Sequence, residues 1–278
     1  MNRISKGIGE KVAQYVLFSL VILLVVLSYL YNEIPKVIFV EEYTFLSLMS
    51  DFQCGRCFPY ILILLISMPM LLNGFNIETV SSRMDYLIIQ RISIIDFYKR
   101  EKLKSFMRGF VFGVAINIAV IVTIWIVHPS SGVKLVSSVT NNTLTQVNNP
   151  IIEFLLSVFL QSIGMGIANV CLFMLTRLRP NKYLYYLSLL LGTVAVSTGI
   201  VVVFALVTMI FPFFNEIVPF VIPLFSIINP LTLLFPNYDL FMLPFSNMFN
   251  FLASLIVYLV LIRWISKKLI QLERMGRI

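Results

Sequence analysis

The sequence predicts an all-α polytopic membrane protein with six transmembrane helices and both termini in the cytoplasm. Of its 278 residues, 59% are hydrophobic and only 12% are charged, and the mean hydropathy is +0.93. Soluble domains carry roughly twice that share of charged residues. The apolar residues form runs near 15–30, 58–74, 109–127, 151–175, 183–214 and 249–264. We treat 1–278 as a single transmembrane domain.

The basic residues predict the orientation. All 21 Lys and Arg except Lys36, Arg56 and Lys134 lie in the two terminal tails or in the connections after the second and fourth runs. Cytoplasmic segments of membrane proteins are enriched in Lys and Arg. The net charge of +8 therefore reflects topology and contact with membrane lipid, and no motif predicts a nucleic-acid partner.

The first run follows a basic tail and lacks a small-x-small cleavage site, so we interpret it as a retained span. The outer loop after it contains Cys54 and Cys57. An oxidising exterior would permit a disulfide between them, whereas free thiols, catalysis and metal binding are the alternatives. The second run contains Pro69, which predicts a kink, and Asn73-Gly74, which predict the end of the helix.

A polar, basic region at 75–108 separates the second and third runs. Asn76 predicts the N-cap of a short amphipathic helix that begins at Ile77. Opposite its apolar stripe lies a mixed polar and apolar face, formed by Glu78, Ser82, Asp85, Tyr86 and Ile89. This face is either a docking surface for a partner or the outer side of a helix lying at the lipid headgroups.

A second helix start follows in the same region. Ser93 with Asp96 three residues later resembles a capping box with Asp in place of Glu. The pattern predicts a second short helix from about Ile94, at a corner near Arg91 to Ser93.

Several polar side chains lie inside the predicted third to fifth spans, namely Asn117, Gln161, Asn169, Thr193 and Ser197. In lipid such groups hydrogen-bond to neighbouring helices or line a water-filled translocation path. Gly164, Gly166 and Gly192 predict close helix packing, and Cys171 predicts a core position.

The segment between the fifth and sixth runs, 217–245, is apolar but interrupted by prolines. Its uninterrupted pieces are too short to cross a bilayer, and exposed non-helical backbone is not tolerated in lipid. We therefore expect half-inserted helices there, on the outer side.

Catalytic and ion-coupled chemistry have little support in the sequence. His128 is the single histidine, and the chain lacks a phosphate-binding loop of the G-x-x-x-x-G-K-[ST] type. Glu153 and Glu216 lie near the outer ends of spans, whereas ion-coupled carriers commonly place a carboxylate at mid-membrane. The pattern thus predicts neither catalytic residues nor a metal site.

The 75–108 region resembles the coupling helix of the membrane subunits of type-2 ATP-binding-cassette (ABC) exporters. Glu78 matches the acidic position, Met84 and Leu87 the apolar ones, Ile92-Ser93 an Ile-Ser pair, and 99–102 the basic lead-in to the third span. Ser82, Arg83, Arg91 and Ile94 depart from the family's Gly, Thr, Pro and Arg.

The resemblance implies a permease subunit in a bacterial plasma membrane, paired with a second permease subunit, identical or related. ATP and Mg²⁺ would bind two separate ATPase subunits, and this chain would hold no cofactor. Its substrate would be a hydrophobic or amphipathic lipid, peptide or drug. An ion-coupled carrier or channel, and an integral membrane enzyme, are the alternative functions.

Overall fold

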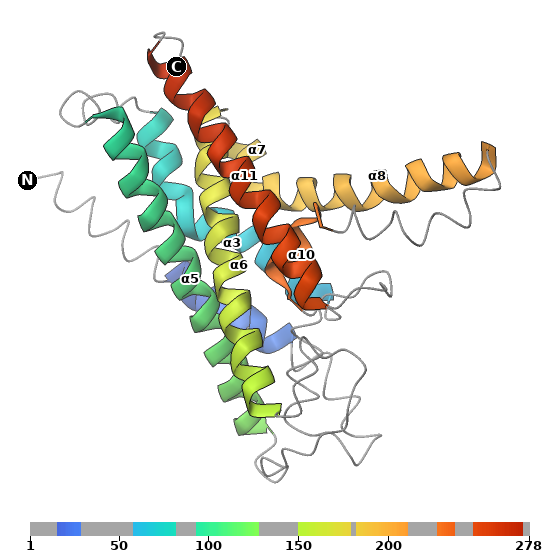
Figure 1. The fold of residues 1–278 in the computed structure, drawn as a ribbon. Coiled ribbons are helices and arrows are strands. Elements are labelled where there is room, and N and C mark those ends of the chain that lie inside the picture. The colour runs from blue at the N-terminus through green and yellow to red at the C-terminus, as the bar shows by residue number, and fades with distance from the viewer. Residues whose placement is uncertain are drawn as a thin grey trace, which may run out of the picture.

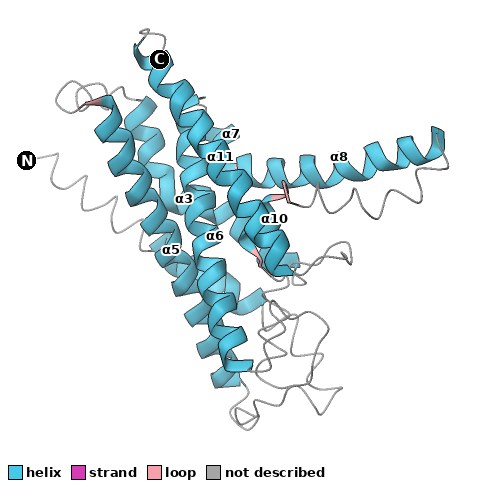
Figure 2. Cartoon of the chain, in the orientation of Figure 1, coloured by secondary structure: helices cyan, strands magenta, loops and turns pink. Residues whose placement is uncertain are grey.

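The computed structural model describes residues 16–28, 58–81, 93–127, 150–178, 182–210, 227–236 and 247–274. Within these ranges the chain forms helices with short connections and no strand (Figure 2). After a helix over Val16–Ser28 come α3 (Phe58–Ser81), α5 (Ile94–Val127), α6 (Pro150–Leu178), α7 (Lys182–Tyr186), α8 (Ser188–Ile210), α10 (Pro230–Leu234) and α11 (Asn247–Arg274).

Three of the described helices are long and apolar enough to cross a membrane, as expected for a membrane-embedded protein. They cover Ile94–Ile126, Phe154–Arg177 and Met248–Glu273. Shorter apolar helices cover Val16–Ser28, Pro59–Asn73 and Ser188–Gly199. The all-helical class is confirmed, and the six-span topology stays a prediction.

The long helices form a bundle around α6 (Figure 1). Phe97 and Tyr98 at the start of α5 pack with Phe173 and Met174 near the end of α6, so these two helices are antiparallel. Ser266 of α11 lies beside Met174, so α11 is parallel to α6. The start of α5 and the ends of α6 and α11 therefore meet at one end of the bundle, which we call the basic end.

Small residues bring α5 and α6 close together. A Cβ added to Gly109 would lie 2.6 Å from the Met165 carbonyl oxygen, and one added to Gly113 would lie 2.9 Å from the Ser162 Cα. Gly109 and Gly113 are four residues apart and thus share one face of α5. This is the small-xxx-small packing common between membrane helices.

The predicted helix start at Ser93 is confirmed, with Ser93 as the N-cap. The Ser93 hydroxyl accepts a hydrogen bond from the Asp96 amide at 3.2 Å and donates one to the Asp96 carboxylate at 2.6 Å. The predicted short helix is wrong, however, because α5 continues for 34 residues to Val127. No proline separates the basic segment from the apolar run, and the two form one helix.

The predicted helix end at Asn73-Gly74 is also wrong, because α3 continues to Ser81. No new helix begins at Asn76 or Ile77. The Asn73 side chain bonds to Asn169 of α6. The corner near Arg91 lies outside the described residues.

The fifth apolar run is not one helix, because it is divided at Leu187. The Leu187 amide bonds to the Tyr183 carbonyl and the Leu191 amide to the Leu187 carbonyl, so the chain passes almost directly from α7 into α8. Helix α8 then projects away from the bundle (Figure 1), and Met209 near its end is 81% exposed. No atom lies within 4 Å of a Cβ added to Gly192, so the predicted packing at this glycine is wrong within the described structure.

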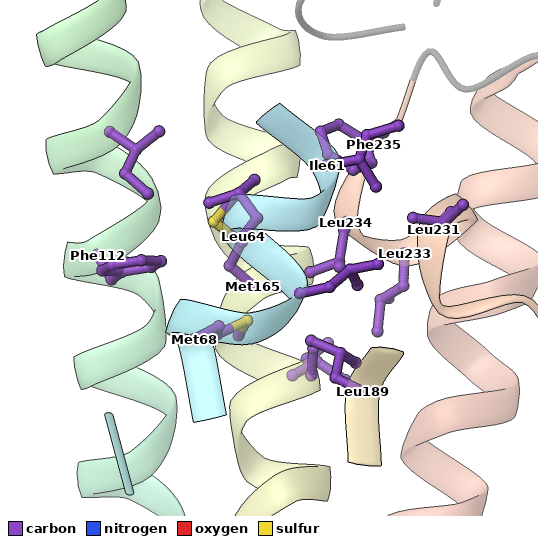
Figure 3. Close-up of a cluster of buried hydrophobic side chains, with 14 of the residues drawn as sticks. Ile61, Leu64, Met68, Phe112, Met165, Leu189, Leu231, Leu233, Leu234 and Phe235 are labelled. Atoms are coloured by element: carbon purple, nitrogen blue, oxygen red, sulfur yellow. The ribbon is translucent and has the colours of Figure 1, made fainter. Parts of the chain in front are cut away.

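In the middle of the proline-rich 217–245 segment, α10 (Pro230–Leu234) packs into the core. Asn229 caps the helix by accepting a hydrogen bond from the Leu231 amide, and Pro230 occupies the first turn. Leu233, Leu234 and Phe235 are fully buried. They belong to one cluster with Leu64 and Met68 of α3 and Met165 of α6 (Figure 3). The rest of the segment lies outside the described residues.

Gly164 of α6 lies directly against the backbone of α10, so its replacement by alanine should destabilise the fold. The added Cβ would lie 1.8 Å from the Leu233 carbonyl oxygen, so α10 would have to move. Overpacking of this kind costs about 1–3 kcal/mol. Gly192→Ala is the matched control, because it meets no neighbour and gains helix propensity. Thermal unfolding in detergent should show a lower Tm for Gly164→Ala alone, and equal Tm values for both variants would contradict this packing.

The predicted topology can be tested by cysteine labelling in intact cells. Ser105 is unsuitable as an inner position because it is 1% exposed and would be silent on either side. Lys104 is a better choice, because its side chain is 60% exposed. With native cysteines removed, Ser137→Cys should react with an impermeant thiol reagent and Lys104→Cys should react only after permeabilisation. The reverse pattern would overturn the predicted orientation.

Candidate functional site

A buried polar network links α3, α5 and α6 near the basic end, with Asn169 at its centre. The Asn73 amide nitrogen donates to the Asn169 side-chain oxygen. The Asn169 amide nitrogen donates to the Ser105 carbonyl at 2.7 Å, and the Ser105 hydroxyl donates to the Asn169 carbonyl at 3.1 Å. All three residues are buried. Asn169 thus joins three helices that are far apart in the sequence.

The network depends on the close approach of α5 to α6. Gly109 lies one turn along α5 from Ser105, and its added Cβ would lie 2.8 Å from the Asn169 Cβ. A larger residue at Gly109 would separate the helices and stretch the bonds at Ser105. Gly109 of α5 therefore lets the two helices come close, and Asn169 of α6 forms the hydrogen bonds that fix their relative position.

The basic end has a second, aromatic cluster. Phe97, Tyr98, Phe173, Met174, Ile265 and Leu269 form a small core of their own. The Arg177 guanidinium lies 5.0 Å from the Phe97 ring centroid and 5.9 Å from that of Phe173, in cation–π contact with both. Arg177 is therefore buried at the end of α6 between aromatic rings of α5 and α6.

Two polar contacts join α5 to the last turns of α11. The Tyr98 hydroxyl donates to the Glu273 carboxylate at 2.6 Å, and the Lys102 ammonium donates to the Ser266 hydroxyl at 3.4 Å. These two contacts and the aromatic cluster connect α5, α6 and α11 at the basic end.

Of the five polar residues predicted in the spans, Asn117 and Thr193 hydrogen-bond within their own helices, and Ser197 hydrogen-bonds to the residue that caps α10. Asn117 donates to the Gly113 carbonyl at 2.9 Å, and Thr193 donates to the Leu189 carbonyl at 2.8 Å, both in their own helices. The Ser197 hydroxyl of α8 accepts a hydrogen bond from the side-chain nitrogen of Asn229 at 3.0 Å. The Tyr258 hydroxyl of α11 also bonds this segment, at the Ile228 carbonyl.

Gln161 behaves differently from the other four. It is 1% exposed, and neither its amide nitrogen nor its amide oxygen has a hydrogen-bond partner within the described structure. The five residues therefore do not share one hydrogen-bonded lining. Asn169 is the centre of a network, Ser197 holds α10, and Gln161 is buried without a partner.

The described residues include only one of the five residues of the predicted docking face. Glu78 lies in the last turns of α3, and Ser82, Asp85, Tyr86 and Ile89 lie outside the described residues, as do Cys54 and Cys57. Cys171 is buried in the main core as a free thiol, as predicted. Among the described residues no group of three or more His, Cys, Asp or Glu is placed to hold a metal ion.

Sequence reasoning missed Asn73, Ser105, Asn229 and Asn250. The sequence predicts a helix end at Asn73, and Ser105 lies in the polar, basic region at 75–108. Asn229 and Asn250 are single amides in apolar surroundings, a signal already used for Asn117 and Asn169. Applying that signal to the proline-rich segment and the sixth span would have found both.

No protein-family model, curated protein or solved structure matches this chain.

The Asn169 network predicts a difference between two Asn→Ala changes. Asn169→Ala removes bonds to two other helices and leaves Asn73 without its Asn169 side-chain acceptor, which should cost about 2 kcal/mol. Asn117→Ala removes only a bond to its own helix and should cost less than about 1 kcal/mol. Thermal unfolding of both variants in detergent measures the difference. Equal losses would show that the network contributes no more than an intrahelical bond.

Proposed function

We propose that this chain is the permease subunit of an ABC exporter, with ATP hydrolysed by separate partner subunits. The observation that best supports the proposal is the continuity of α5. A single helix runs from the Ser93 cap, inside the 75–108 region that resembles a coupling helix, into the apolar segment that would cross the membrane. Motion applied at its basic end would therefore be passed on without an intervening hinge.

The length of α5 fits this role. At 1.5 Å per residue, 34 residues span about 51 Å, whereas a bilayer core needs roughly 30 Å. About two-fifths of the helix would thus extend beyond the hydrocarbon core. This extension carries Lys99, Arg100, Lys102, Lys104 and Arg108, which suits the cytoplasmic side.

The basic end supplies a means of passing motion from α5 to other helices. Tyr98 bonds to Glu273, and Phe97 packs on Arg177, so a shift of α5 would be felt at the ends of α11 and α6. ATP-driven closure of the partner subunits would move the 82–92 region, and α5 with it. The membrane part would then change the side to which its cavity opens.

The α10 segment also fits the proposal. A short helix between the fifth and sixth apolar runs is in keeping with the half-inserted helices expected there from the sequence. Hydrogen bonds of Asn229 and Tyr258 join this segment to α8 and α11. Its burial against α3 and α6 means that any rearrangement of these helices would displace it. The exported substrate would be hydrophobic or amphipathic, in keeping with the apolar bundle. A second permease subunit would complete the translocation path.

The docking face provides the sharpest test. If Tyr86 and Ile89 occupy a groove on an ATPase, changing both to Ala should remove about 2–4 kcal/mol and weaken association roughly thirtyfold or more. The measurement is the amount of ATPase that copurifies with each variant from detergent.

The matched control changes the neighbouring apolar residues on the opposite stripe, Leu87 and Ile88, to Ala. This variant should lose stability and yield yet keep its ATPase in proportion to folded protein. Full retention of ATPase by the Tyr86/Ile89 variant, or no ATPase with the wild-type chain, would overturn the proposed function.

A further inference from the structure

The exposed surface of α11 changes from apolar to basic at Arg263. Leu259, Val260 and Leu261 are exposed apolar side chains. Directly after them, the exposed residues are basic or aromatic, namely Arg263, Trp264, Lys267 and Lys268. A helix that leaves a bilayer shows this order, because acyl chains contact its apolar side chains and lipid headgroups contact its basic ones.

Helix α5 adds basic residues at the same level of the bundle. The Lys102 ammonium donates a hydrogen bond to the Ser266 hydroxyl of α11 at 3.4 Å. Lys99 is three residues before Lys102 and is therefore on the same side of α5. On α11, Arg263 is three residues before Ser266, and Lys267 is next to it. We call the basic residues at this level the cationic band, namely Lys99, Lys102, Arg263, Lys267 and Lys268.

The positive charge of the cationic band is not neutralised within the described residues. Each acidic side chain of α5 and α11 is bound by a residue outside the band, in the pairs Asp96–Ser93, Glu101–Lys104 and Glu273–Tyr98. No member of the band forms a salt bridge with a described carboxylate. The band therefore attracts anions from outside this part of the chain.

The two tryptophans of the chain mark two levels that lie about one hydrocarbon core apart. Trp264 is 56% exposed, with the Lys268 ammonium 4.7 Å from its ring centroid, and Trp125 near the end of α5 is 68% exposed. Because Lys102 lies beside Ser266 and the two helices are antiparallel, Trp125 is about 21 residues further along the bundle than Trp264. At 1.5 Å per residue this is about 32 Å, close to the roughly 30 Å thickness of a hydrocarbon core.

Tryptophan is enriched at both interfaces between membrane and water, so Trp264 places the cationic band at the level of the lipid headgroups. We propose that the band binds the phosphate groups of anionic phospholipids. The exposed apolar residues that precede Arg263 would contact the acyl chains of the same lipids. This continuity favours a lipid over an acidic protein, which would cover the basic residues alone. The proposal goes beyond the proposed function, because it needs a membrane and no ATPase.

The test uses Trp264 as a reporter of the lipid beside it. In the Trp125→Phe chain, Trp264 is the single tryptophan. The full chain is reconstituted into vesicles of equal parts phosphatidylcholine and phosphatidylglycerol, in which one lipid or the other carries bromine on its acyl chains and quenches tryptophan fluorescence on contact. Quenching should show phosphatidylglycerol enriched beside Trp264 by roughly threefold or more, and the enrichment should shrink at high salt.

The reverse reporter provides the first control. In the Trp264→Phe chain, Trp125 is the single tryptophan, and the last turn of its helix carries no basic residue. Trp125 should therefore be quenched to the same extent by the two brominated lipids.

Matched charge variants locate the binding. In the Trp125→Phe background, Arg263→Gln with Lys267→Gln should remove most of the enrichment. Lys104→Gln with Arg108→Gln removes the same charge from another side of α5 and should leave the enrichment unchanged. All four positions are exposed, so the variants should fold, and quenching by brominated phosphatidylcholine verifies their insertion.

Three results would overturn the proposal. Equal quenching of Trp264 by the two lipids would show that the band does not select anionic headgroups. An enrichment that the Arg263/Lys267 variant retains, or that both double variants lose equally, would show only a general attraction to a positive protein. Absence of quenching by either lipid would place Trp264 outside the membrane, as expected if the band meets an acidic protein. None of these measurements involves an ATPase, so the result is independent of the proposed ABC function.

Discussion

The close contact between α5 and α6 is the constraint on which the rest of the fold depends. Glycine at positions 109 and 113 lets the α5 backbone approach Met165 and Ser162. At that separation a side chain as short as asparagine can reach the backbone of the facing helix. Asn169 does so at Ser105 and also binds Asn73, which positions α3. One pair of small residues thus places three helices, since lipid offers polar groups no alternative partner.

The α10 segment is placed mainly by apolar burial and not by a network of hydrogen bonds between helices. Prolines prevent this segment from forming a span, and its backbone needs cover in an apolar environment. The chain supplies cover by burying Leu233 to Phe235 against α3 and α6 and by capping the helix with Asn229. The contact at Gly164 is again between a glycine and a backbone carbonyl. Gly109 and Gly113 of α5 therefore allow close contact with α6, and Gly164 of α6 allows close contact with the short inserted helix.

Local sequence signals proved reliable where the interaction itself was local. The Ser93–Asp96 cap involves residues three apart and was predicted with its helix start. The end of α3 was not, because α3 continues past Asn73-Gly74, where the Asn73 side chain bonds to Asn169, 96 residues away. The partners of Asn169 and the unpaired state of Gln161 likewise depend on tertiary packing. A single sequence indicates that these amides lie inside but not what they face.

An unbroken α5 also has a thermodynamic consequence. A rigid element has no preferred direction of transmission, so the coupling free energy between its two ends is the same whichever end is perturbed. A ligand that favours one arrangement of α5 and α6 within the membrane would change the affinity of any partner at 82–92 by the same factor by which that partner changes the affinity for the ligand. The same helix that would pass motion from the partner into the membrane would therefore also pass the effect of ligand binding in the membrane back to the partner.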